Sequence, residues 1–434
     1  MKRFHRLHPL FAGLLVTGIA LSAVPGHASS LPRSHGNASV SIRMAYFGGP
    51  DTKALLDKIT PKYEKAYKGT TVVYEPEADR VKQVTAIAAG TAPDVFMLGD
   101  GDVRWYEAKG ALANLSPYMK KDKVSTSQWI KGTLSIGTRK GKIYALPKDY
   151  STLAVYYNKD MFRAAGVPFP KKGWTLNQFR ADAVKLTKND IYGASLSGDW
   201  VREVDPFVRE LGGHLDNSNG TKTVGYMNSP ATVKAIQWWV DLFLKYKISP
   251  TPAAAKSLGI GDLFASQKAA MNVTGIWPSL GASGYPSTLK FNWGVAPFPT
   301  GPHAKHVNTI CWAGFGMSPT SKHKNQAWGL VKYMAGPVGD NVWGTAGGLP
   351  ALKAIAAKHK VSKNPVSGVF LKEAKFSDLP SDINGPAAPQ AVSDTLTEGL
   401  DLLLNSPNAG TVQQVLTIEA QKGQKAIQQY NAGG

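Results

Sequence analysis

Hydrophobic and polar positions near the start of the chain follow two periods in turn, one typical of strands and one typical of helices. The predicted elements, in order, are a strand at 40–46, a helix at 52–67, a strand at 70–75, a helix at 80–89 and a strand at 95–98. The last strand is apolar at every position, which is typical of the middle of a parallel sheet. Two successive strand–helix–strand units therefore predict an α/β lobe with right-handed crossovers.

Residues 141–167 predict a connection between two lobes. A short strand is expected to end at Pro147, a polar segment follows at 148–152, and an apolar strand at 153–157 precedes a short helix that Gly166 ends. Backbone that passes between two lobes without a core of its own has to stay extended and to face whatever lies between them. We therefore expect a hinge here.

The rest of the chain predicts a second α/β lobe and two further crossings. The expected elements are a strand at 191–195, an extended return at 291–298, a second crossing at 308–318, a third crossing at 347–350 and a helical remainder with a proline-rich loop at 378–390. Thr175 and Gln178 have the spacing of a capping box at a helix start.

Several of these segments resemble the extracellular solute-binding proteins, in particular the maltose-binding-protein-like group that binds sugars. The similar stretches are Pro147 with the Tyr-Tyr-Asn-Lys-Asp run at 156–160, GTAPDVFML at 90–98, the double glycine at 212–213 and FASQKAAMNVT at 264–274. The resemblance implies a type II periplasmic binding protein-like fold, in which two α/β lobes close on a ligand by hinge motion. It also implies delivery of that ligand to the membrane permease subunits of an ABC transporter.

Together these signals divide the chain into six segments. We expect a signal peptide at 1–28, a flexible leader at 29–38, the first lobe at 39–148 and 310–348, and the second lobe at 149–309 and 349–434. The signal peptide is predicted from a basic start, an apolar run too short to span a bilayer comfortably and small residues at 26–28. The alternative is an uncleaved anchor. No other stretch of the sequence approaches the length of a membrane span.

Composition adds to this prediction in two ways. The formal net charge is +20, of which the acid-free signal segment supplies three charges. This excess of positive charge favours association with a negatively charged cell envelope. The basic residues are scattered along the chain and form no nucleic-acid-binding pattern, so we expect no nucleic acid partner. The only cysteine is Cys311, which excludes an intramolecular disulfide. No cysteine follows the signal segment as a lipid anchor would require, which leaves open how the protein is retained at the cell. We expect an exported monomer in the periplasm or at the outer face of the membrane or cell wall.

Sugar recognition needs aromatic faces that stack on a pyranose ring and planar polar groups that bind its hydroxyls. The aromatic candidates at a strand end or a crossing are Trp277, Trp312, Trp200, Tyr46, Phe47 and Tyr150, and Trp343 is a further candidate, because it follows a helix of the first lobe and could face the cleft. In the family that the chain resembles, a tryptophan at the position of Trp277 commonly lines the sugar site. For the others, packing within the lobe or the hinge is the alternative.

The candidate hydroxyl partners are Asp100, Asp79, Asp149 and Asp199. Asp100 follows an apolar strand at the edge where open α/β sheets bind ligands. A helix cap is the alternative for Asp79, and a turn residue is the alternative for Asp149.

No catalytic motif, cofactor motif or metal-ligand spacing stands out in the sequence, so we expect a binding protein without a cofactor or metal. The resemblance implies a sugar ligand, and the tryptophans near strand ends favour a di- or oligosaccharide. Three alternatives stay open. An anionic ligand, such as a glycerophosphodiester or uronate, would be marked by Arg104, Lys148 or Arg202 in the cleft. A secreted glycosidase would use a carboxylate pair such as Asp199 and Glu203. An adhesin would bind polyanions through its basic surface.

Overall fold

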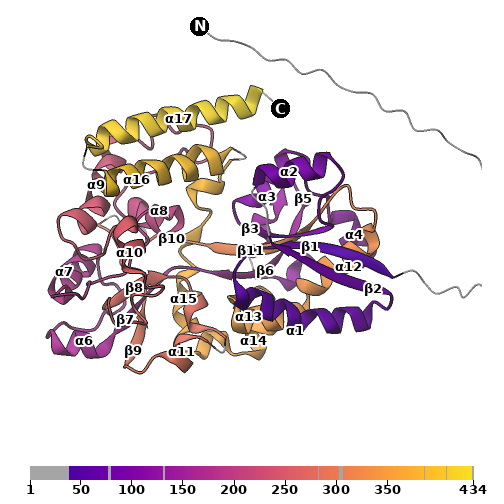
Figure 1. The fold of residues 1–434 in the computed structure, drawn as a ribbon, viewed down its shortest axis with the longest axis horizontal. Coiled ribbons are helices and arrows are strands. Elements are labelled where there is room, and N and C mark those ends of the chain that lie inside the picture. Colours follow the sequence, from indigo (N-terminus) through magenta and orange to yellow (C-terminus); the bar gives the residue numbers. More distant parts are fainter. Residues whose placement is uncertain are drawn as a thin grey trace, which may run out of the picture. The chain divides into compact units, whose positions relative to one another are not determined.

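The computed structural model describes residues 39–76, 80–130, 132–281, 283–302, 306–385, 387–406 and 408–432. The predicted signal peptide and leader lie outside this range, and so does Asp79. The described chain forms a two-lobed α/β fold, and the elements of each lobe are labelled in Figure 1.

The first lobe is built on a six-stranded sheet of order β12-β6-β11-β3-β1-β2. Its strands are β1 (Val40–Tyr46), β2 (Thr70–Pro76), β3 (Val95–Gly99), β6 (Ala145–Ser151), β11 (Cys311–Met317) and β12 (Leu349–Pro350). Strand β1 pairs in parallel with β2 and with β3, which confirms the predicted strand–helix–strand units. Strand β11 runs antiparallel to β3 and β6, so a late segment of the chain completes the middle of this sheet.

Helices and a small hairpin surround this sheet. They are α1 (Pro50–Ala66), α2 (Arg80–Ala88), α3 (Asp102–Ala108), α4 (Ser116–Lys121), α5 (Thr133–Ile136), β4 (Thr138–Arg139), β5 (Lys142–Ile143), α12 (Lys324–Met334), α13 (Pro337–Ala346) and α14 (Lys353–Lys358). Helix α1 buries Leu56, Ile59 and Tyr63 in a core that also holds Phe315 of β11 and Trp343 of α13. This packing places the N-terminal end of α1 beside α13 at one edge of the lobe.

The second lobe has a three-stranded antiparallel sheet of order β8-β7-β9, formed by β7 (Ala154–Asn158), β8 (Met271–Thr274) and β9 (Trp293–Ala296). Its helices are α6 (Lys159–Ala164), α7 (Leu176–Leu186), α8 (Val201–Glu210), α9 (Pro230–Leu244), α10 (Pro252–Leu258), α11 (Tyr285–Thr288), α15 (Ser367–Glu373), α16 (Thr395–Asn405) and α17 (Val412–Ala432). The pair β10 (Asn308–Thr309) and β13 (Ser377–Asp378) runs parallel. The predicted capping box of Thr175 and Gln178 is confirmed at the start of α7.

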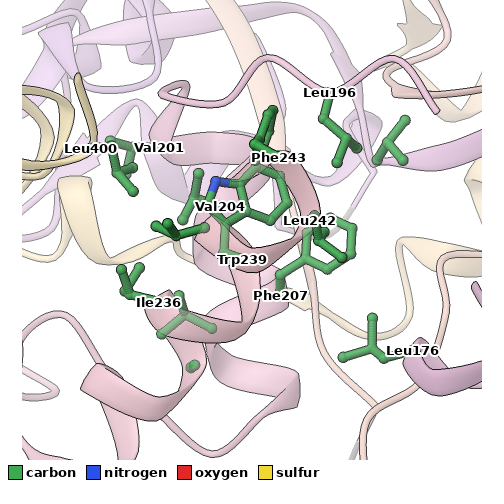
Figure 2. Close-up of a cluster of buried hydrophobic side chains, with 14 of the residues drawn as sticks. Leu176, Leu196, Val201, Val204, Phe207, Ile236, Trp239, Leu242, Phe243 and Leu400 are labelled. Carbon is green, nitrogen blue, oxygen red and sulfur yellow. The ribbon is translucent and has the colours of Figure 1, made fainter. Parts of the chain in front are cut away.

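Aromatic packing between α8 and α9 forms the centre of the second lobe (Figure 2). Trp239 is fully buried, and its ring centroid lies 5.0 Å from that of Phe207. Its indole Nε1 donates a hydrogen bond of 2.9 Å to the backbone oxygen of Gly198, so the one polar atom of the ring is satisfied. Leu400 of α16 belongs to the same cluster, which ties the C-terminal helices to this lobe.

The predicted end of a strand at Pro147 is wrong, because β6 continues to Ser151. The register between β6 and β11 shifts at this point: Ala313 pairs with Asp149, and Gly314 pairs with Pro147. Lys148 is thereby left without a partner on β11, as in a β-bulge. A bulge accommodates a proline within a strand, and it also changes the direction in which the extra side chain points.

Three other expectations are corrected. Residues 191–195 form only isolated bridges with neighbouring segments, because each contact lasts for a single residue. The proline-rich stretch 378–390 contains a turn of 3-10 helix, η4 (Ser381–Ile383). The return to the second lobe comes later than residue 349, because β12 pairs with β6 and Leu352 and Ile355 pack in the core of the first lobe.

The first two crossings are held together by one buried side chain. Asn308 accepts a hydrogen bond from the backbone nitrogen of Leu153 at 3.2 Å and donates one to the backbone oxygen of the same residue at 2.9 Å. Its amide nitrogen also lies 2.7 Å from Oε2 of Glu373, a residue of α15. The two connections between the lobes are therefore coupled to each other and to the C-terminal part of the chain.

Candidate ligand-binding site

A cavity of about 880 Å³ is lined by residues of both lobes. It is bordered by the start of α1, the end of β3, the bulged part of β6, the start of β11, the end of α13 and the 3-10 turn η2 (Trp277–Ser279). Eight of the eleven residues that the sequence predicted for ligand binding line it: Phe47, Asp100, Asp149, Tyr150, Trp200, Trp277, Trp312 and Trp343. The carboxyl ends of β1 and β3 lead into this cavity, as open α/β sheets generally place their ligands.

Trp200 and Trp277 form the aromatic wall of the second lobe. Their ring centroids lie 6.0 Å apart with the planes at 69°, an edge-to-face arrangement. Trp200 is the residue that precedes α8, and Trp277 begins the 3-10 turn after β8. The Trp277 residue remains 39% exposed although it lines a cavity. An apolar ring with this much open surface at a concave site is suited to stack on a ligand.

The aromatic residues of the first lobe are more deeply buried. Trp312 retains 5% of its exposure and Trp343 is fully buried, so each presents only part of its ring to the cavity. The indole nitrogens of both rings have no hydrogen-bond partner within the described residues. Tyr150 is opposite Trp312 in the β6–β11 pairing.

Lys148 and Asp149 form an ion pair in the wall of the cavity, with Nζ of Lys148 against Oδ2 of Asp149. Both side chains are 9% exposed, and the Lys148 ammonium lies 4.6 Å from the centroid of the Trp343 ring. Gly347 and Gly348 allow this arrangement, because a Cβ at Gly347 would lie 2.9 Å from Oδ2 of Asp149 and one at Gly348 would lie 2.8 Å from its Cγ. Any larger residue there would displace the carboxylate.

Asp100 also lines the cavity, but both of its carboxylate oxygens are already engaged. Its Oδ1 accepts from Nη2 of Arg202 at 2.8 Å and from the backbone nitrogen of Gly101 at 3.0 Å. Its Oδ2 accepts from the backbone nitrogen of Trp312 at 3.1 Å. Burial raises the pKa of Asp100, and the Arg202 guanidinium opposes that change.

Two of the predicted residues lie elsewhere. Tyr46 packs edge-to-face on Tyr74 of β2, with centroids 6.0 Å apart, and does not line the cavity. Asp199 is half-buried beside α16, where its backbone oxygen accepts from Thr397 at 3.2 Å. Asp79, the third, lies outside the described residues.

Asp51 and Lys58 of α1 also line the cavity, and sequence reasoning missed both. Each lies on the exposed side of an amphipathic helix, where a charged side chain is indistinguishable in sequence from a solvated one. The loop after η2, which contributes Leu280 and Gly284, carries no recognisable motif either. Only its position after Trp277 could have indicated it.

The two carboxylates named as an example for the glycosidase alternative, Asp199 and Glu203, do not line the cavity. Glu203 is buried, and burial raises its pKa to about 8 despite a hydrogen bond of 2.8 Å from the backbone nitrogen of Ser197. The side chain therefore serves the start of α8 and not the cleft.

Comparison with known proteins supports the fold and the class. Maltodextrin-binding protein MdxE of Bacillus subtilis is 23% identical over 84% of this chain and 85% of its own. A solved ABC substrate-binding protein of Listeria monocytogenes, in complex with cycloalternan, is 25% identical and superposes with a TM-score of 0.78 over 90% of this chain and 99% of that one. UgpB of Mycobacterium tuberculosis, solved with glycerophosphocholine, is 18% identical with a TM-score of 0.74 over 91% and 99%.

Within the described residues, no helix combines the length and the apolar character that a membrane span requires. The family model for bacterial extracellular solute-binding proteins matches residues 49–340, which is more than half of the chain and includes Trp200, Trp277 and Trp312 of the cavity. The chain therefore belongs to the bacterial extracellular solute-binding proteins, as its hinge and strand motifs predicted.

Proposed function

We propose that this protein captures a neutral di- or oligosaccharide in the cavity between its lobes and delivers it to an ABC importer. The observation that carries the proposal is the pair of Trp200 and Trp277, which presents open aromatic surface to a cavity that also holds charged hydrogen-bonding groups. Aromatic faces suit the C–H faces of sugar rings, and charged groups suit their hydroxyls. A volume of about 880 Å³ is near the upper end of ordinary ligand sites, which favours more than one sugar ring.

The pairing of the buried cations near the cavity favours a neutral ligand. Of the three cations that would mark an anionic ligand, Lys148 is paired with Asp149, and Arg202 is paired with Asp100 and Asp382. The third, Arg104, donates to the backbone oxygen of Asn384 and does not line the cavity. An anionic ligand would have to compete with these carboxylates for Lys148 or Arg202. It would lose its hydration on entering the cavity and would find no buried cation that lacks a carboxylate partner.

The fold by itself does not select the ligand, because one solved structure of this fold contains a sugar and another contains glycerophosphocholine. The environment of Asp149 supports a sugar as the ligand. Its Oδ2 faces Lys148, and within the described residues its Oδ1 has no hydrogen-bond partner. A carboxylate oxygen of this kind, beside a lysine and an aromatic wall, can accept from a sugar hydroxyl.

The experiment is a thermal unfolding series of the purified protein with malto-, xylo-, gluco- and galacto-oligosaccharides, followed also by tryptophan fluorescence. A ligand that binds only the folded state raises the melting temperature with its concentration. We expect one oligosaccharide class to stabilise the protein and to shift the emission, and both effects to disappear in Trp277→Ala. Trp238→Ala is the matched control, because Trp238 is half-buried on α9, outside the cavity.

Two arms of the same series test the alternatives. Glycerophosphodiesters and uronate oligomers should leave the melting temperature unchanged, and stabilisation by them alone would move the function to an anionic ligand. Steady release of reducing ends from any oligosaccharide would instead show an enzyme and contradict a transport role.

A further inference from the structure

Arg202 is the centre of a buried ionic group at the boundary between the lobes. Its side chain is 6% exposed, and its Nη2 lies 2.8 Å from Oδ1 of Asp100 while its Nε lies 3.1 Å from Oδ2 of Asp382. Asp100 follows β3 in the first lobe, whereas Arg202 lies on α8 and Asp382 lies on η4 in the second lobe. The Asp100–Arg202 contact, called the interlobe ion pair below, therefore connects the two lobes directly.

This ion pair holds the second crossing from both sides. Nη1 of Arg202 donates to the backbone oxygen of Ile310 at 3.3 Å, and Oδ2 of Asp100 accepts from the backbone nitrogen of Trp312 at 3.1 Å. Between Ile310 and Trp312 lies only Cys311, the first residue of β11, and β10 ends at Thr309. A motion of the lobes that separates α8 from the end of β3 has to break the contact between Asp100 and Arg202.

The same two side chains are linked to aromatic residues on both sides of the cavity, which are called its two aromatic walls below: Trp200 and Trp277 in the second lobe, and Trp312 and Trp343 in the first. Arg202 lies two residues after Trp200, which precedes α8 and contacts Trp277. Asp100 fixes the backbone of Trp312 on the opposite side. The ion pair thus links the segment that carries Trp200 in the second lobe to the segment that carries Trp312 in the first.

The surroundings of Arg202 also make the pair breakable. If the lobes separate, Asp382 stays with Arg202 in the second lobe, so the guanidinium does not become a buried charge without a partner. Asp100 is the more exposed of the two carboxylates, at 19% against 9%, and it faces the cavity, where water can replace Arg202. An ion pair with one permanent and one exchangeable carboxylate suits a contact that is made and broken repeatedly.

We propose that Asp100 and Arg202 are positioning residues, whose ion pair holds the lobes at the angle at which the two aromatic walls face each other. This inference rests on the proposed function and gives Asp100 a different task from the one that the sequence suggested. Asp100 does not select the ligand by its hydroxyl pattern. It sets the fraction of molecules in which the lobes hold the cavity in its binding-competent arrangement. A change in this fraction changes the affinity for every ligand by the same factor.

The first test is a measurement without ligand, so that it does not depend on the proposed function. Spin labels at Lys62→Cys on α1 and Lys256→Cys on α10, both exposed, report the distance between the lobes by pulsed electron resonance. We expect Asp100→Asn to shift or broaden the distance distribution relative to the parent protein. Arg202→Lys retains the positive charge but loses the guanidinium that contacts Asp100 and Asp382 at the same time, so it should give an intermediate distance distribution.

Arg209→Gln is the matched control. Arg209 lies on the same helix and contacts a buried aspartate, Asp205, at 3.5 Å, but that pair lies within the second lobe. It should lower the melting temperature without changing the distance between the labels. If Asp100→Asn also leaves the distance distribution unchanged and only lowers the melting temperature, the interlobe ion pair is a stabilising contact and the proposal is wrong.

The second test uses the affinity for whichever oligosaccharides bind. Asp100→Asn should weaken all of them by the same factor, about tenfold or more, because a change in the ready fraction affects every ligand equally. Loss of affinity for one sugar with no change for another would show that Asp100 contacts the ligand, and would overturn the inference. If no sugar binds the parent protein, the proposed function fails, and the label distances still decide the role of the ion pair.

Discussion

His306 should make the protein lose stability as the pH rises above neutrality, and replacing it by glutamine should remove much of that loss. The ring lies between two buried carboxylates: Nδ1 is 2.5 Å from Oε1 of Glu210, and Nε2 is 2.9 Å from Oε2 of Glu373. Its other ring neighbours are Phe298 and Phe376. The imidazole connects α8 to α15 just before the second crossing.

The size of the effect follows from the pKa of the ring. Burial disfavours the charged imidazolium, but the hydrogen bonds and charges of Glu210 and Glu373 outweigh burial and raise the pKa of His306 from 6.5 to about 9. A separation of about 2.5 between folded and unfolded pKa values corresponds to about 3 kcal/mol. Because the folded value is the higher one, this stabilisation is fully present below pH 6.5 and is lost as the pH rises through 9.

The assay is urea unfolding of the parent protein and of His306→Gln at pH 6.5 and pH 9.5. The parent should lose about 3 kcal/mol more between these two values than the variant does. His359→Gln is the control, because His359 is exposed and its ring contacts only the amide of Asn341. An equal loss in the parent and in His306→Gln would refute the reasoning, because the buried ring would then not be the group that releases its proton.

Two further predictions concern the packing that supports the cavity. Trp239→Ala should lower the free energy of unfolding by about 3–5 kcal/mol, because it leaves a large void against Phe207 and removes the bond to Gly198, and denaturant unfolding measures it. Asn308→Ala should cost about 1–3 kcal/mol, because it leaves the buried backbone groups of Leu153 without partners, and amide hydrogen exchange at Leu153 should rise.

Each of these variants has a control at a less buried residue of the same type. Trp277→Ala removes a tryptophan that is 39% exposed, so it should cost far less stability than Trp239→Ala, and equal losses would show that burial does not set the effect. Asn405→Ala removes a half-buried asparagine on α16, whose amide donates to Asp401 and whose oxygen accepts from the backbone nitrogen of Ala253, and it should leave exchange at the crossing unchanged. Unchanged exchange at Leu153 in Asn308→Ala would mean that the two crossings are not coupled through that side chain.

The framework of the first lobe could be predicted from sequence because its signals are local. The apolar strand β3, the amphipathic helix α1 and the strand at 40–46 each show their period within a few residues, and the structure confirms all three. The strand β6 could not be predicted to its end, because its bulge at Lys148 depends on pairing with Ala313 and Gly314 of β11, more than 160 residues later. Register between distant strands is not encoded in the spacing of either one.

The site was predictable only where its signals are local in the sequence. Trp277 was identified because it follows a strand and a glycine, and the structure places it in the cavity wall. The partner of Asp100 was not identifiable, because Arg202 lies 102 positions later and only the fold brings the two together. Trp343 was expected to face the cleft, yet Lys148 covers one of its faces, and this contact depends on the bulge in β6.

The most direct test of the central claim is isothermal titration calorimetry of the parent protein with the stabilising oligosaccharide and with glycerophosphocholine at matched concentrations. We predict saturable binding of one neutral oligosaccharide per protein, lost in Trp277→Ala and accompanied by a negative heat-capacity change from burial of the aromatic wall. Binding of glycerophosphocholine, with no heat from any neutral oligosaccharide, would contradict the assignment of this cavity to a sugar.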